Sequence, residues 1–258
     1  MGSASREALA KAKSALSGRL GKAVGSELLS ASAQIEGSPA LVSALADASL
    51  PASAKAEVVG KLFGSLSAGA RSVLTAAVEQ NWSTAAEFVD GVEELGFRAQ
   101  ALAEPGLADE LLAATATINS SHELELELGN KLGDPAAKAQ LASKIFSGKL
   151  SAGALGVVAH VVANPRGRRV NAALTEAARV AADQGGLELA TVTVAAPLTS
   201  AQQEKLAALL EQSAGRKVKV TTVVDPALIG GVRIHMADDV IDGSVRARLE
   251  DLRQRLAA

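Results

Sequence analysis

Three histidines, His122, His160 and His235, are the side chains of this sequence that most often supply metal ligands or acid–base groups. They lie far apart in the chain and in different predicted elements, and no His-Glu-x-x-His or similar spacing brings two of them together. The sequence contains no cysteine, which excludes thiol nucleophiles, disulfides and thiolate metal sites. We therefore interpret the histidines as packed or surface residues and expect no metal and no cofactor.

The densest basic cluster consists of Arg166, Arg168 and Arg169. It could bind a phosphate or an acidic partner, but its place at the start of a predicted helix favours a solvated surface loop. The Gly-x4-Gly-Lys-Ser/Thr pattern of a P-loop does not occur, so we do not expect the chain to bind ATP in that way. No set of residues remains that could carry a reaction, and the sequence predicts a protein that is not an enzyme.

Charge and composition narrow the classes of partner. The net charge is −2, so no overall field attracts nucleic acid, and four Phe, one Trp and no Tyr leave few platforms for stacked bases. We expect no nucleic-acid partner. Nowhere do 18 apolar residues run together, and the first residues lack the apolar core of a signal peptide. Membrane association is therefore expected only indirectly, through a partner.

With so few aromatic residues, the core must be built from Ala, Leu and Val, which suit closely packed helices. Apolar residues recur at helical spacing from Arg6 to Gln184, which predicts a series of helices. Pro and Gly divide this stretch at five places: Gly37-Ser38-Pro39, Leu50-Pro51, Glu104-Pro105-Gly106, Asp134-Pro135 and Asn164-Pro165.

The helical stretch contains an internal repeat. Residues 27–63 align without a gap on residues 110–146, at a constant offset of 83, with 14 identities in 37 positions. The shared Lys-x5-Lys-[Leu/Ile]-Phe, followed in both places by Leu-Ser-Ala-Gly, favours duplication over chance similarity of Ala-rich helices. The alternation of Glu and Leu at 123–128 could indicate an exposed strand, but its repeat partner at 40–45 favours a helix. We predict two helical modules, 1–105 and 106–184.

After Gly185-Gly186 the pattern changes to alternating, β-branched stretches. The fold class predicted is mostly α: an N-terminal helical bundle with an internal duplication, followed by a small α/β C-terminal domain over 187–258. The elements expected in that domain are a strand at 187–194, a helix at 200–213 capped by Thr199 or Ser200, a strand at 217–223, a hairpin of 232–236 and 240–241 with its turn at Ala237-Asp238, and a last helix at 243–256 with Val245, Leu249, Leu252 and Leu256 on its apolar side.

The C-terminal stretch VVDPALIGGVRIHMADDVIDGSVRARLEDLRQRL resembles the signature of the delta, or oligomycin-sensitivity-conferring, subunits of ATP synthase. It has an Asp-Pro turn, Leu-Ile-Gly-Gly, a strand, a hairpin that ends in Ile-Asp-Gly-Ser, and a helix with repeated Leu. The resemblance is strong over residues 160–256 and weakens toward the N-terminus. Members of that family usually have a single helical domain, so the duplicated module is a departure from the pattern.

The resemblance implies a non-catalytic stator subunit in the peripheral stalk of a rotary, proton-translocating ATP synthase. The helical domain would bind the N-terminal segments of alpha subunits, the C-terminal domain would bind the b subunit, and the complex would hold the chain at the cytoplasmic face of the bacterial cell membrane. Which helical copy contacts the catalytic head is left open by the duplication. The alternative is a generic helical-repeat scaffold, which would explain the repeat but not the C-terminal signature.

The signature residues also have physical roles of their own. We expect the seven that follow to be structural, with no catalytic, cofactor-binding or metal-binding part: Asp225, Pro226, Gly230, Gly231, Asp242, Gly243 and Ser244. An Asp-Pro pair fixes a turn, and paired glycines permit a positive φ or a close backbone approach. Asp or Ser ahead of the last helix can accept hydrogen bonds from its free N–H groups.

Overall fold

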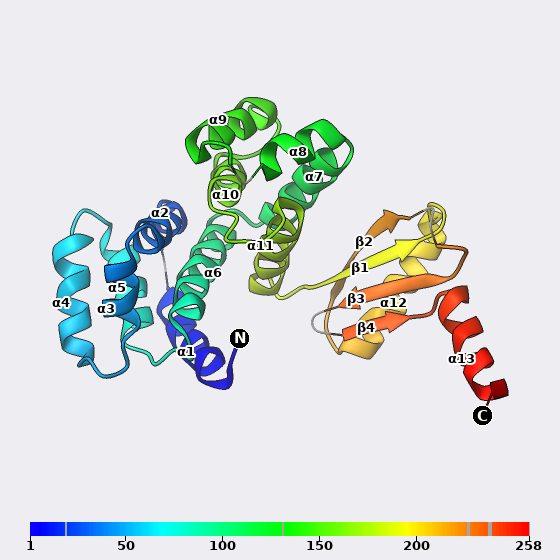
Figure 1. Ribbon diagram of the computed structural model, residues 1–258, viewed down its shortest axis with the longest axis horizontal. Coiled ribbons are helices and arrows are strands. Elements are labelled where there is room, and N and C mark those ends of the chain that lie inside the picture. The colour runs from blue at the N-terminus through cyan, green and yellow to red at the C-terminus, as the bar shows by residue number, and fades with distance from the viewer. Residues whose placement is uncertain (19, 131, 226–227, 237–238, 258) are drawn as a thin grey trace. The chain divides into compact units, whose positions relative to one another are not determined.

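The computed structural model describes residues 1–18, 20–130, 132–225, 228–236 and 239–257. Within these ranges the chain divides into two compact units, Met1–Ala181 and Ala182–Ala258. The first unit is helical and the second holds the sheet (Figure 1). The predicted class, a helical bundle followed by a small α/β domain, is confirmed.

The helical region is a succession of short helices joined by tight loops. Its elements are α1 (Ser3–Lys13), the 3-10 helix η1 (Ser14–Leu16), α2 (Val24–Glu36), α3 (Pro39–Ala46), α4 (Ala52–Leu62), α5 (Ala68–Val78), α6 (Ala85–Ala103), α7 (Leu107–Asn119), α8 (His122–Gly129), α9 (Pro135–Phe146), α10 (Ala152–Ala163) and α11 (Val170–Gln184). The predicted breaks coincide with helix ends, and at two of them Ser38 and Asp134 accept hydrogen bonds from the first turn of the next helix. Residues 123–128 lie in α8, so the helical prediction is confirmed and the strand alternative is wrong.

The helix starts repeat along the chain. The first residues of α7, α8 and α9 are 107, 122 and 135, and those of α2, α3 and α4 are 24, 39 and 52, a difference of 83 in each pair. Buried residues follow the same spacing: Leu28, Ile35, Leu45 and Phe63 in the first copy, and Leu111, Ile118, Leu128 and Phe146 in the second. Matching sequence, helix bounds and burial support the proposed duplication; the division of the helical unit near residue 105 stays a prediction.

Polar contacts inside the two copies also correspond. Glu27 of α2 accepts a hydrogen bond from the hydroxyl of Ser67, the N-cap of α5. In the second copy Glu110 of α7 accepts from the backbone N–H of Ser151, the N-cap of α10, at 2.5 Å. In each copy, therefore, one carboxylate contacts the N-terminus of the equivalent helix, where it complements free N–H groups and the helix dipole.

Helix α6 is the centre of the helical unit. It contacts α1, α2, α3 and α5 of the first copy and also α7 of the second (Figure 1). Its approach to α2 is close because small residues stand at the crossing: a Cβ at Gly25 would lie 2.7 Å from the backbone nitrogen of Gln100, and one at Gly96 would lie 2.7 Å from Cδ2 of Leu29. Of the two copies, the first is therefore built directly around α6.

The C-terminal unit is a four-stranded sheet with the order β2-β1-β3-β4. Its strands are β1 (Glu188–Val194), β2 (Val218–Val224), β3 (Val232–Met236) and β4 (Asp239–Asp242). Strands β1 and β2 are parallel and the other pairs are antiparallel. The helix α12 (Ser200–Ala214) connects the parallel pair and buries Leu210 against Ala190, Val192 and Ile234.

The sequence predicted these C-terminal elements within one or two residues. Thr199 caps α12 in a capping box with Gln202, and Gly215 ends that helix with φ of 69°. Strand β4 is longer than the predicted pair Val240-Ile241, and the last helix, α13 (Val245–Ala257), starts two residues later than predicted. The predicted hairpin turn, Ala237-Asp238, and Pro226 lie outside the described residues.

Candidate functional site

The first signature segment, Asp225 to Gly231, lies at the end of β2. The backbone N–H of Asp225 donates to the carbonyl of Val194 at 2.9 Å, and the N–H of Leu228 donates back to the Asp225 carbonyl at 3.0 Å. Asp225 thus continues the contact of β2 with β1 and also contacts the start of the segment that leads to β3.

Gly231 occupies the tightest point of the signature. Its φ is +81°, a conformation that L side chains rarely adopt, and a Cβ would lie 2.9 Å from Cα of Ser244 and clash with the carbonyl of Gly243. Next to it, the carbonyl of Gly230 accepts from the N–H of Val245 at 3.0 Å. The two glycines therefore let the Leu-Ile-Gly-Gly segment pack directly on the start of α13.

Asp242, Gly243 and Ser244 form the junction between β4 and α13. The N–H of Gly243 donates to the carbonyl of Val232 at 2.9 Å. Asp242 accepts from the N–H of Ser244 at 2.9 Å, and the buried Ser244 hydroxyl accepts from the N–H of Ala247 at 3.2 Å. Ser244 is therefore the N-cap of α13, and Asp242 fixes the turn in front of it.

Electrostatics hold Asp242 in its ionised form. Hydrogen bonds from Ser244, and then the bond and charge of Arg233, lower the pKa of Asp242 to about 2. Arg233 Nε lies 3.0 Å from Asp242 Oδ2, across the β3–β4 pair. Each contact of this junction shapes backbone, which is what the predicted structural role of the signature residues requires; that role stays a prediction.

Large apolar side chains are exposed around the signature. Ile229 is 77 % exposed and Leu249 is 56 % exposed; the others of the set are Val240, Ile241 and Val245. We call these five residues the apolar rim. Sequence reasoning found Val245 and Leu249 from their helical spacing but missed Ile229, Val240 and Ile241, which look like ordinary strand and loop residues. Arg246 and Arg253 of α13 are also exposed.

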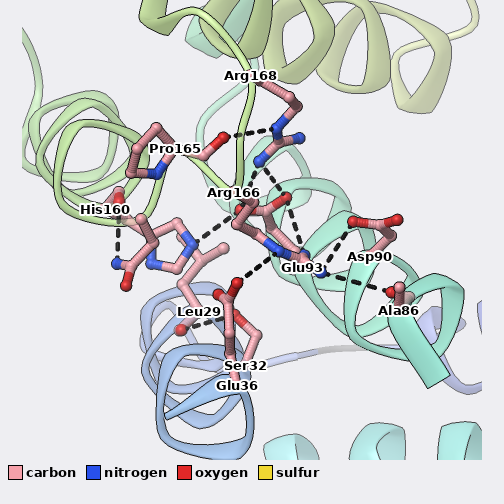
Figure 2. A network of polar contacts seen from close by, with 11 residues as sticks. Leu29, Ser32, Glu36, Ala86, Asp90, Glu93, His160, Pro165, Arg166 and Arg168 are labelled. Carbon is pink, nitrogen blue, oxygen red and sulfur yellow. Dashed lines mark hydrogen bonds and ion pairs between the residues drawn. The ribbon is translucent and has the colours of Figure 1, made fainter. Parts of the chain in front are cut away.

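A buried charge network lies in the helical unit, where the sequence predicted none. Glu93 of α6 is only 2 % exposed and contacts three basic side chains (Figure 2). Its Oε1 lies 3.1 Å from Nε2 of His160, and its Oε2 lies 2.8 Å from Nη2 of Arg168 and 3.6 Å from Nη1 of Arg166. The three partners come from α10 and from the loop that follows it.

Arg166 reaches two helices at once. It contacts Glu36 of α2 at 3.2 Å and Asp90 of α6 at 2.9 Å. Its backbone has φ of 53°, and Gly167 follows with φ of 75°, in a turn closed by the N–H of Arg168 and the carbonyl of Pro165 at 2.9 Å. A left-handed non-glycine residue is strained. The turn that directs the Arg166 side chain inward therefore costs conformational free energy.

The interpretation of the arginine cluster as a solvated loop is therefore wrong for two of its three members. Arg166 is 10 % exposed and Arg168 is partly buried, and only Arg169 is an exposed side chain. The physical reason is the inward turn, which pairs both side chains with carboxylates from distant parts of the chain. His160 is packed edge-on against Phe97, and His122 and His235 are exposed, in agreement with the prediction for the histidines.

The pKa values of the two central carboxylates move in opposite directions. Burial pushes the pKa of Glu93 up, but the hydrogen bond from His160 and the charges of Arg168 and Arg166 outweigh it, so the net pKa is lowered. For Asp90, burial is the largest cause and raises the pKa despite the two arginines. Glu93 is thus the ionised centre of the network.

The pocket beside this network does not suit an anionic ligand. It has a volume of about 210 Å³ and is lined by Asp90, Glu93, Glu94, Glu176, Phe97 and Arg168 among others. Carboxylates dominate the lining, and Arg168 is already engaged with Glu93. No phosphate-binding role follows from it.

Both regions have the character of a structural protein, because their polar contacts hold backbone turns and join helices. Residues 99–256 match the family model for the ATP synthase delta (OSCP) subunit. The ATP synthase subunit delta of Leifsonia xyli is 42 % identical over 263 residues, and that of Nocardia farcinica is 37 % identical over 270; both alignments cover all of both chains. For the Streptomyces avermitilis subunit delta, identity is 34 % and coverage is 90 % of this chain and 88 % of the relative.

The chain belongs to the ATP synthase delta (OSCP) family. It is accordingly a structural, non-catalytic subunit with a role in the peripheral stalk, and it is associated with the membrane through the complex. Within the described residues, no helix has both the length and the apolar character needed to cross a membrane.

Proposed function

We propose that this chain is the stator subunit that links the catalytic head of a rotary, proton-translocating ATP synthase to the b subunit. The observation that carries the proposal is the family match over residues 99–256, which spans nearly half of the helical unit and all of the signature. The division into two compact units also supports it, because a mechanical link needs separate surfaces for its two partners. At the cytoplasmic face of the bacterial membrane, such a link would keep the head from turning with the rotor.

The b subunit would bind the C-terminal unit at the apolar rim. Exposed Ile229, Val240 and Leu249 offer the kind of apolar surface that a partner helix covers, and exposed patches of this kind usually mark interfaces. Arg246 and Arg253 would favour acidic residues at the edge of that partner and set its register. Burial of the apolar side chains would supply most of the affinity.

The helical unit would bind the N-terminal segments of alpha subunits. The family match starts at residue 99, near the end of α6, so we propose that the second copy contacts the head and that the first copy is the addition. In the second copy, the exposed Leu126 and Leu141 are suitable apolar contacts for such a segment. In the first copy, Leu50 and Leu62 are exposed to a similar degree.

Titration of the full-length chain with two peptides tests this assignment. One peptide is the C-terminal segment of the b subunit and the other is the N-terminal segment of the alpha subunit. We expect Leu249→Asp to weaken b binding at least tenfold with alpha binding unchanged, and Leu126→Asp to do the reverse. Leu62→Asp is the matched control in the first copy. Loss of alpha binding in Leu62→Asp alone would assign the head contact to the first copy instead.

The helical-repeat scaffold is the competing function. It predicts that the chain co-purifies with other partners and not with membrane ATPase activity. We expect affinity-tagged chain to recover ATPase activity from solubilised membranes, and the Leu249→Asp variant to recover the head without the membrane sector. Absence of ATPase activity from the wild-type preparation would reject the stator proposal.

A further inference from the structure

We infer that the buried charge network is a joint that fixes the two helical copies to each other. Three carboxylates, Glu36, Asp90 and Glu93, face three basic side chains, His160, Arg166 and Arg168 (Figure 2). This inference goes beyond the proposed function, because it concerns the internal mechanics of the chain and does not depend on which partners bind.

The charges are divided strictly between the copies. The three carboxylates lie in α2 and α6, within residues 1–105, and the three basic side chains lie in α10 and the following loop, within residues 106–184. Each ion pair of the network therefore crosses from one copy to the other. A network that served one copy alone would have both signs of charge on that copy.

The repeat itself shows that these charges are specific to the junction. The offset of 83 between α2 and α7 places Asn119 opposite Glu36, and the offset of 84 between α5 and α10 places Ala76 opposite His160. The starts of α6 and α11, 85 and 170, place Ala178 opposite Glu93. The equivalent positions are uncharged in each case.

Contacts internal to a copy behave in the opposite way. The carboxylate at the N-terminus of α5, Glu27 with Ser67, has its equivalent in Glu110 with Ser151 at the N-terminus of α10. The duplicated contacts stabilise each copy. The unduplicated network joins the copies, together with Glu104 of the first copy, which accepts hydrogen bonds from Ser151 and Gly153 at the start of α10. The strained left-handed Arg166 supports this reading, because strain of this kind persists where the surrounding contacts hold it in place.

Breaking the network should release the joint and leave each copy folded. Removal of one partner leaves an uncompensated buried charge, which favours any arrangement that exposes that charge to water. Since Glu93 lies between the copies, the least disruptive way to hydrate the arginines is to separate α10 and its loop from α6. The expected consequence is a change in the distance between the copies.

Pulsed electron–electron distance measurements on the full-length chain test the joint. The sequence has no native cysteine, so spin labels can be placed on engineered cysteines alone. Exposed Ser53 of α4 and Lys144 of α9 form a pair across the joint, and Ser53 with exposed Ala10 of α1 forms a pair within the first copy. We expect Glu93→Gln to add a second distance population across the joint and to leave the internal pair unchanged.

Matched variants make the result decisive. Glu57→Gln, which removes an exposed pair with Lys61, should leave both distances as in the wild type. Arg168→Gln keeps the strained turn at Arg166 and provides a milder break if Glu93→Gln does not fold. An unchanged distance across the joint in folded Glu93→Gln or Arg168→Gln, or equal broadening of both pairs, would overturn the inference.

Discussion

The helical unit and the C-terminal unit differ in how many of their charged residues are drawn into internal ion pairs. In the helical unit, charged residues such as Glu93 and Arg166 are drawn inside and paired with one another. In the C-terminal unit most charges stay near the surface, with the buried Glu188 as an exception, and large apolar residues such as Ile229 and Leu249 are exposed around the signature. Buried ion pairs fix one arrangement of helices, whereas exposed apolar residues are available to a partner. The helical unit thus combines an internal charge network with exposed leucines such as Leu126, whereas the C-terminal unit exposes its apolar residues around a signature held by backbone contacts.

The largest effect expected is on the helical unit. Glu93→Ala leaves Arg168 and Arg166 without their shared carboxylate, and loss of one partner of a buried pair typically costs about 3–5 kcal/mol. Urea unfolding followed by the fluorescence of Trp82, the one tryptophan of the sequence, reports on this unit alone. The control Glu57→Ala breaks an exposed pair and should cost about 0.5 kcal/mol or less. Equal losses of unfolding free energy in Glu93→Ala and Glu57→Ala would show that the buried pair holds the helical unit no better than an exposed one.

The second effect is a backbone effect in the C-terminal unit. Gly231→Val places a β-branched residue at φ of +81° and against Gly243 and Ser244, which should cost about 1–3 kcal/mol. Amide hydrogen exchange of β1 and β3 measures it. Gly230→Val is the matched control, because its Cβ would meet only the side chain of Val245, at 3.3 Å, and no backbone. If the amides of β1 and β3 exchange as slowly in Gly231→Val as in the wild type, the backbone conformation at position 231 does not require glycine.

The third effect is the loss of a helix cap. Ser244→Ala removes the acceptor for the Ala247 N–H, which should cost about 0.5–2 kcal/mol, and should loosen α13 before the sheet. Asp242→Ala should lower stability as well, by releasing the turn in front of the cap. Neither change should alter Trp82 fluorescence, because that residue lies in the other unit. If amide exchange is unchanged in both Ser244→Ala and Asp242→Ala, these residues are not needed for stability, and partner binding becomes the role to test.

The sequence could predict what depends on local pattern. Helical periodicity, the offset of 83 and the alternation after Gly186 located most helices and strands, since each signal is carried by neighbouring residues or by a close repeat. The capping residues Thr199 and Ser244 were recognisable for the same reason. The family resemblance rested on a contiguous stretch of the chain.

The charge network could not be predicted in that way. Glu93 is 67 residues from His160 and 75 from Arg168, and Glu36 is 130 residues from Arg166, so no local pattern connects them. Charged residues are usually exposed, which made the arginine loop look like surface. One signal was present in the sequence: within the aligned repeat, Glu36 corresponds to the uncharged Asn119, so this charge was an exception within an otherwise similar pair of copies.

The smallest effect concerns pH and the signature turn. The pKa of Asp242 is lowered to about 2, from 3.8, chiefly by hydrogen bonds from Ser244. A group whose pKa is depressed by folding contributes stability above its unfolded pKa and loses that contribution as the pH falls through the folded value. The contribution of Asp242 should therefore be complete at pH 5 and should decline between about pH 4 and pH 2. Asp242→Asn keeps an oxygen for Ser244 but removes the charge, so it isolates this contribution.

We expect amide exchange in β3 and α13 to be faster in Asp242→Asn than in the wild type at pH 5, after correction for intrinsic exchange rates. The difference should shrink as the pH approaches 2, because the wild-type carboxyl is then protonated and resembles the amide. Glu93 also has a lowered pKa, so the helical unit loses stability with acid in both proteins and serves as the internal reference, followed through Trp82. A difference between variant and wild type that stayed constant down to pH 2 would mean that the charge of Asp242 plays no part, and that its oxygen alone holds the turn.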